Sequence, residues 1–181
     1  AGTLTCVIGA TMGLMAGYLR GWVDLVISRC IEIWMAFPPV LFSILLIAVL
    51  GPGISSIIIA IVVIDWTRVA RVIRAEAMAQ GAMDYVASAQ VSGRARLSTM
   101  VIEILPNVLP TIVVLLTLEM GIAVIVEAIL SFVNLSISTD DPTWGGMIAE
   151  GRLSIHQAWW VLVFPLITLF LTVLSFSQLG E

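Results

Sequence analysis

The feature that most constrains the fold is a series of uncharged stretches that are long enough to cross a lipid bilayer. A membrane-spanning helix needs roughly 20 mostly apolar residues. Residues 1–19 carry no charge and are followed by Arg20 and Trp22, which suit a membrane interface. Residues 33–64 are also uncharged and are too long for one crossing. Residues 51–53, Gly-Pro-Gly, divide this stretch into two predicted helices joined by a tight turn.

Two further apolar stretches lie later in the chain. The fourth runs from about Ile104 to Leu135 and is interrupted by Glu119 and Glu127, and the fifth covers about 159–179. Hydrophobic residues make up 60% of the chain and charged residues 11%, a balance that a soluble domain of this size cannot bury. The sequence therefore predicts an all-helical, polytopic transmembrane domain with about five spans.

Two polar segments separate the spans of this single domain, residues 1–181. Residues 74–99 are rich in alanine and other helix formers, and Gly81 and Gly93 break the pattern. Residues 136–157 carry acidic side chains and the only histidine of the chain. These segments are predicted to be the two large loops of the domain.

The arginines predict how the domain sits in the membrane, because short cytoplasmic loops collect basic residues. One arginine, Arg152, lies in the second loop, and the others are expected to flank loops on the opposite side: Arg20, Arg29, Arg68, Arg71, Arg74, Arg94 and Arg96. This distribution predicts that the loop at 74–99 is cytoplasmic and that the loop at 136–157 is external.

The residue types exclude several chemistries. All basic residues are arginines, so no lysine is available for a Walker A phosphate loop or a Schiff base. We expect no catalytic residue and no nucleotide-hydrolysing site. Basic stripes with interleaved aromatic residues are absent, which makes nucleic acid an unsuitable partner. Cys6 and Cys30 lack a CxxC spacing and His156 stands alone, so we expect no metal site.

Residues 76–93 and the string Leu-Pro-Asn-Val-Leu-Pro at 105–110 form the most specific motif. A short helix and a glycine about a dozen residues before Leu-Pro resemble the "EAA" loop of ABC importer permeases. The pattern is most similar to the second permease of dipeptide, oligopeptide and nickel importers. Further stretches agree in order: Gly21-Trp22-Val23-Asp24, Ala36-Phe37-Pro38, Glu127-Ala128-Ile129-Leu130-Ser131-Phe132 and Pro142-Thr143-Trp144-Gly145-Gly146-Met147.

The resemblance implies that the chain is half of a pore in a bacterial or archaeal inner membrane, paired with a second permease. Two partner ATP-binding subunits would hold ATP and magnesium, and this chain itself would bind no cofactor. An extracytoplasmic binding protein would deliver a peptide or a related small solute. The resemblance also implies a first span before Ala1 and a short tail after Glu181.

A permease without an ATP site must receive mechanical work through a contact, and a short cytoplasmic helix can supply that contact. The residues expected to couple to the ATPase are Glu76, Asp84, Tyr85, Val86, Ala87, Ser88, Ala89 and Gly93. Small residues allow close approach, Tyr85 is a broad interface anchor, and Gly93 can adopt the positive φ that ends a helix. Ala87 stands where the family's triplet usually opens with glutamate, so Asp84 or Glu76 is the candidate for a substitute polar contact.

Leu105, Pro106 and Pro110 are predicted to form a hinge at the start of the fourth span. Proline has no N–H and disturbs the helical hydrogen bonds. A kinked entry at this point would transmit motion from the loop at 74–99 into the membrane.

Three carboxylates fall within or beside the predicted spans: Asp65, Glu119 and Glu127. Charged groups in a membrane are costly, so they suggest either a transport pathway or a buried polar contact. Asp65 could pair with Arg68, and Glu127 could simply lock helices near the outer face. The four-residue spacing of Gly9, Gly13 and Gly17 indicates close helix packing, either inside the chain or at the seam with a second permease.

Two other functions fit some of these features. A secondary, ion-coupled transporter would use the three carboxylates as ion sites. A membrane-embedded scaffold or receptor would have no transport activity. Transport that depends on an ATPase would distinguish the importer from both.

Overall fold

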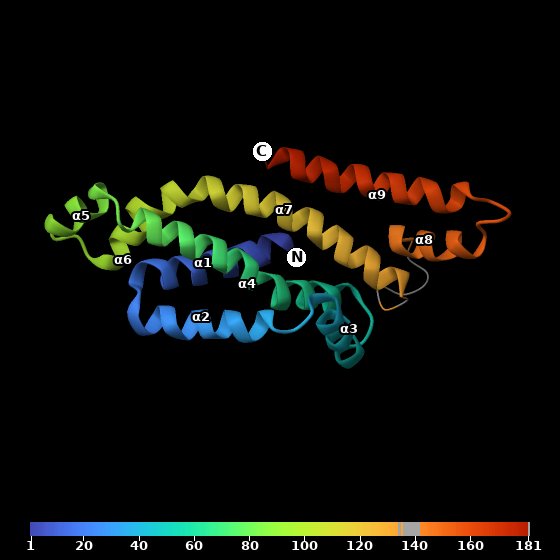
Figure 1. Cartoon of the computed structure of the whole chain (residues 1–181), viewed down its shortest axis with the longest axis horizontal. Helices are drawn as coiled ribbons and strands as arrows, with labels where there is room; N and C mark the ends of the chain where they lie inside the picture. Colours follow the sequence, from blue (N-terminus) through green and yellow to red (C-terminus); the bar gives the residue numbers. More distant parts are fainter. Residues whose placement is uncertain (134, 136–141, 181) are drawn as a thin grey trace.

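The computed structural model describes residues 1–133, 135 and 142–180, which form helices and connecting turns without a strand. The helices are α1 (Gly2–Leu19), α2 (Gly21–Met35), α3 (Pro39–Leu50), α4 (Ile54–Gln80), α5 (Asp84–Val91), α6 (Arg96–Thr99), the π-helix η1 (Met100–Ile104), α7 (Leu105–Phe132), α8 (Trp144–Leu153) and α9 (Trp160–Leu179). Long helices run side by side, α5 and α6 lie at one end, and α8 lies at the other (Figure 1).

Three helical segments of the described chain are long and apolar enough to cross a membrane. They are α1, the continuous run of α6, η1 and α7 at Arg96–Phe132, and α9. The pair α2 and α3 becomes a fourth candidate when it is counted as one broken span. These segments confirm the expected all-helical, polytopic fold. α4 would complete the expected five spans, but its second half carries charged side chains.

The core forms where α1 packs along α4, and glycines allow this close approach. A methyl group on Gly9 would lie 2.7 Å from the carbonyl oxygen of Trp66, and one on Gly13 would lie 2.6 Å from that of Ala70. A methyl group on Gly17 would likewise clash with the backbone of α4. Of the two alternatives for the glycine stripe, the structure shows internal packing.

The chain bends sharply between α2 and α3, which corrects the single helix expected from residue 33 to the Gly-Pro-Gly turn. The two helices differ in direction by 86°, and the break falls at residues 36–38. Pro39 occupies the first turn of α3, where its missing N–H costs nothing. The indole Nε1 of Trp34 donates to the carbonyl oxygen of Val63, so the end of α2 is attached to α4.

The predicted loop at 74–99 also differs from its expected form. α4 continues without interruption to Gln80, so the first quarter of this segment belongs to a long helix. Alanine and other strong helix formers in this stretch explain the extension. A short turn, α5 and α6 make up the remainder. Arg68, expected to flank a loop, instead lies within α4.

α8, the C-terminal end of α7 and the N-terminal end of α9 form the opposite end of the molecule (Figure 1). α8 occupies part of the predicted loop at 136–157, of which residues 136–141, including Asp140 and Asp141, lie outside the described residues. The Thr143 side chain accepts a hydrogen bond from the Gly146 N–H and so caps α8. Gly145 lies so close to the Ala128 carbonyl that a methyl group would be only 2.2 Å away. α8 is therefore wedged tightly against α7.

Candidate functional site

The first candidate site is α5, the short helix at one end of the bundle. Its single buried residue is Val86, which joins a hydrophobic core of side chains from α1, α4 and α7. The Tyr85 hydroxyl donates to Gln80 Oε1 at 2.8 Å, and Gln80 Nε2 donates to Glu76 Oε1 at 2.9 Å. Burial raises the pKa of Tyr85 above its usual value, which moves ionisation of the hydroxyl still further from physiological pH.

Two more contacts attach the α5 region to neighbouring helices. Gln90 Nε2 donates to the hydroxyl of Tyr18, at the end of α1, over 3.2 Å. Arg94 forms an ion pair with Glu103 of η1. Between them, Gly93 has φ of 81° and ends the helix, as the sequence predicts. α5 is therefore held by α1, α4 and η1.

The opposite side of α5 is open. Asp84, Ala87 and Ser88 are exposed, and Ala89 is half-buried. Val91, the last residue of α5, is 90% exposed. The predicted coupling residues thus divide into Tyr85 and Val86, which attach the helix, and small side chains that are free to contact another protein. Glu76 belongs to α4, and its carboxylate accepts a hydrogen bond from the Gln80 side chain.

The predicted hinge follows a change in helical geometry. The N–H of Leu105 donates to the carbonyl of Met100, five residues back, and this bond closes the π-turn η1. Pro106 falls in the first turn of α7, and Pro110 lies inside the helix. Both prolines therefore sit just beyond a stretch whose helical hydrogen bonds are already irregular.

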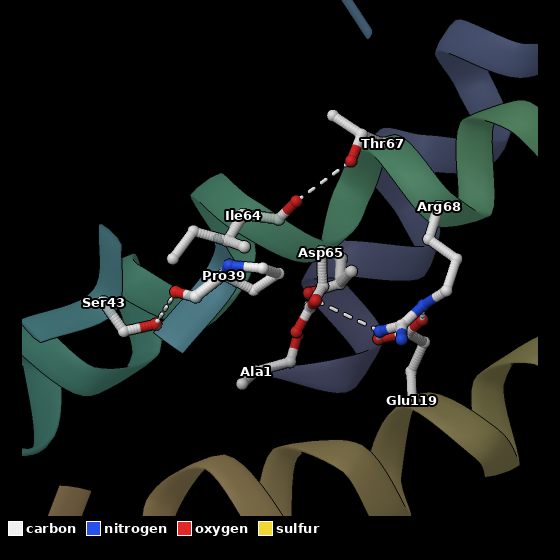
Figure 2. Close-up of polar contacts among 9 residues, drawn as sticks. Ala1, Pro39, Ser43, Ile64, Asp65, Thr67, Arg68 and Glu119 are labelled. Atoms are coloured by element: carbon white, nitrogen blue, oxygen red, sulfur yellow. Dashed lines mark hydrogen bonds and ion pairs between the residues drawn. The ribbon is translucent and has the colours of Figure 1, made fainter. Parts of the chain in front are cut away.

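The second candidate site is a cluster of charges between α4 and α7. Arg68 donates through Nε to Glu119 Oε1 at 3.0 Å and through Nη2 to Glu119 Oε2 at 3.2 Å. The same Nη2 lies 3.1 Å from Asp65 Oδ1. Figure 2 shows the arginine side chain reaching from α4 toward Glu119, with Asp65 beside it. The carboxylates are almost fully buried, whereas the arginine side chain is 41% exposed.

Glu127, the third predicted carboxylate, lies two turns further along α7. Its carboxylate accepts a hydrogen bond from the Ser131 hydroxyl in the next turn. Asp65 and Glu119 are thus brought together by Arg68, and Glu127 has a separate local environment.

Sequence reasoning missed the ion pair between Asp24 of α2 and Arg74 of α4. Arg74 Nη2 donates to Asp24 Oδ2 at 2.8 Å, and Ser28 donates to Asp24 Oδ1 at 3.1 Å. Together with the contact of Trp34 on Val63, this pair fixes both ends of α2 to α4. Asp24 belongs to one of the quoted sequence stretches, but its partner is 50 residues away and no local spacing indicates it.

The described residues contain no group of three or more histidine, cysteine, aspartate or glutamate side chains that could hold a metal ion. Within the same part of the chain, Cys6 is buried and Cys30 is exposed, and neither forms a disulfide.

Several apolar helices of bilayer length, joined to a short polar helix at one end, define a multi-pass integral membrane protein. The chain belongs to the family of binding-protein-dependent transport system inner membrane components, which it matches over residues 9–179.

Bacterial relatives agree with this assignment. The chain is 34% identical to the glutathione transport system permease protein of Pectobacterium atrosepticum over 174 residues, covering 96% of this chain and 58% of that protein. It is 34% identical to the dipeptide transport system permease protein of Alkalihalophilus pseudofirmus over 175 residues, or 97% and 58%. The di/tripeptide permease protein of Pseudomonas aeruginosa is 32% identical over 178 residues, or 98% and 59%. The chain thus spans less than two thirds of these relatives.

Proposed function

We propose that the chain is a permease subunit of an ABC importer and moves peptides or a related small solute across the bacterial inner membrane. The observation that carries this proposal is α5, a short helix with an open face of small residues, attached by its other face to three elements of the membrane bundle. The peptide and glutathione transport named for its relatives supports the substrate class.

The partners follow from what this chain lacks and from its family. Without a lysine the chain has no Walker A motif, so the ATP and magnesium would be held by two separate ATP-binding subunits. The family description supports a binding protein that delivers the solute from outside. A second permease would complete the pore.

The attachment of α5 suggests how a movement of the ATP-binding subunits would be transmitted to the helices of the bundle. When the ATP-binding subunits close, each would displace the α5 helix docked on it. Because α5 is connected to Tyr18 of α1, Gln80 of α4 and Glu103 beside α7, its displacement would carry these helices with it. The bundle would then alternate between inward-facing and outward-facing states. In this mechanism α5 is a lever, and the transport energy comes from outside the chain.

The docking is tested by cysteine cross-linking in the full-length complex. Cys6 and Cys30 are first replaced by serine, and a cysteine is introduced at Ser88 in the exposed face of α5. Ser88→Cys should cross-link to a cysteine in the groove of the ATP-binding subunit. Leu153→Cys, also exposed and in α8 at the opposite end of the molecule, is the matched control and should not cross-link.

Transport assays distinguish the importer from an ion-coupled carrier. An importer loses uptake when the ATP-binding subunits are inactivated and keeps uptake when a protonophore is added. A transport-competent complex in which Ser88→Cys never reaches the ATP-binding subunit would refute the docking. Uptake that persists without the ATP-binding subunits would refute the proposed function itself. The family match favours the importer.

A further inference from the structure

An apolar groove lies among side chains of α7, α8 and α9. Figure 1 shows that these helices adjoin at the end of the bundle away from α5. The volume of the groove is about 230 Å³. All the residues that line it are apolar: Ile125, Ala128, Ile129, Phe132, Ile148 and Leu169. A ligand inside the groove would meet hydrocarbon on every wall, so the site suits a hydrocarbon chain far better than a polar solute.

A cation lies at the rim of this groove. Arg152 follows Ile148 by four residues and therefore shares a face of α8 with it. The guanidinium carbon of Arg152 lies 5.1 Å from the centre of the Phe132 ring, which itself lines the groove. Arg152 is exposed, and no ion pair among the described residues includes it. Its positive charge is therefore available to an anion at the mouth of the groove.

The neighbouring helix α9 packs closely against α8 at Gly151, where a methyl group would lie 2.7 Å from the backbone of Leu162, but most of its side chains point away from the bundle. Pro165 is its single buried residue, and large side chains such as Phe164 and Phe170 are exposed. Such a surface faces lipid in a multi-pass membrane protein. The helix that forms one wall of the groove therefore has an exposed apolar surface of the kind that suits contact with acyl chains.

We propose that the groove holds an acyl chain of a phospholipid and that Arg152 binds the phosphate of the same molecule. An apolar groove and a cation at its rim match the two halves of a phospholipid, and the protein is immersed in this ligand. The bound chain fills the space between α7, α8 and α9 and so fastens α9 to the bundle. This site is separate from α5 and from the Arg68 cluster.

The proposal is tested with the full-length transporter complex, purified in mild detergent and mixed with dioleoylphosphatidylglycerol. Native mass spectrometry then counts the lipid molecules retained. Arg152→Gln should lower lipid retention about fivefold, the effect expected for one arginine near a lipid phosphate. Arg152→Lys keeps the charge and should retain most of the lipid. Arg29→Gln removes an exposed arginine from α2 and should change nothing.

A second pair of variants tests the groove itself. Leu169→Trp fills the groove and should expel the lipid, whereas Leu171→Trp adds the same bulk to an exposed position of α9 and should not. Normal lipid retention by Leu169→Trp, in a complex that elutes as the wild type does, would overturn the proposal. So would equal retention by Arg152→Gln and the wild type. A second copy of this chain retained in place of lipid, and lost in Leu169→Trp, would also overturn it.

Discussion

The guanidinium of Arg68 on α4 and the carboxylate of Glu119 on α7 form a bidentate ion pair inside the helical bundle. The two residues are 51 positions apart, so the pair ties together helices that are connected through α5. Two parallel N–H···O bonds make this the strongest geometry available to an arginine and a carboxylate. The pair thus links α4 directly to α7.

Replacing Arg68 by methionine should destabilise the protein markedly. The change leaves Glu119 and Asp65 buried without the guanidinium that compensates their charge. Removing one partner of a buried pair costs about 3 to 5 kcal/mol. We expect about 2 kcal/mol here, because the arginine side chain is 41% exposed. Unfolding in graded denaturing detergent measures the loss.

The double variant Arg68→Met with Glu119→Gln provides the control. It removes the buried charge of Glu119 together with its partner, so much of the lost stability should return. A double variant no more stable than Arg68→Met alone would contradict the assignment of the effect to an uncompensated carboxylate.

Gly13→Ala should destabilise the packing of α1 on α4. The added methyl group would lie 2.6 Å from the carbonyl oxygen of Ala70, so the helices must separate. Overpacking of this kind costs about 1 to 3 kcal/mol. The matched control is Gly121→Ala on α7, where the nearest heavy atom is 3.7 Å away and alanine is the better helix former. Thermal unfolding should separate the two variants, and equal midpoints would contradict the packing.

Gly93→Ala should weaken the end of α5. Gly93 has φ of 81°, a conformation that costs about 1 kcal/mol for alanine and less for asparagine. Hydrogen exchange of α5 should therefore be fastest in Gly93→Ala, intermediate in Gly93→Asn and slowest in the wild type. No methyl clash contributes, because open space surrounds this position. An asparagine variant that exchanges faster than the alanine variant would contradict the conformational explanation.

Asp24 and Arg74 should show a coupling free energy of about 1 kcal/mol in a double-mutant cycle. Both side chains are only partly exposed, and a serine hydroxyl also supports the carboxylate. Asp24→Ala, Arg74→Ala and the double variant supply the cycle, with stability read from denaturing-detergent unfolding. The coupling should shrink at high salt because screening weakens partly exposed ion pairs. Strict additivity of the two single changes would show that the pair does not fasten α2.

Membrane helices were the easiest elements to predict because apolar length alone determines them. α1 and α9 begin one residue after the predicted starts of 1–19 and about 159–179 and end at the predicted residues. The Gly-Pro-Gly break and the positive φ of Gly93 could also be predicted from the sequence, since both depend on local backbone chemistry. Asp65 and Arg68 lie about one helical turn apart, and their pairing was also expected.

Contacts between distant helices could not be read from the sequence. No pattern indicates that Arg68 also holds Glu119, or that Asp24 faces Arg74, because register between packed helices depends on the whole bundle. The break between α2 and α3 was missed for a related reason. Uncharged sequence continues through residues 36–38 and hides a change of direction that packing imposes.

The glycines of α1 have a mechanical consequence for the proposed transport cycle. The three α1 glycines lie so close to α4 that an added methyl group would meet backbone or Cβ atoms of α4, which leaves little room for the two helices to move closer together. We expect two helices that pack in this way to move together as one rigid body. In the proposed transport cycle, we therefore expect the helices to slide or pivot along other boundaries of the bundle.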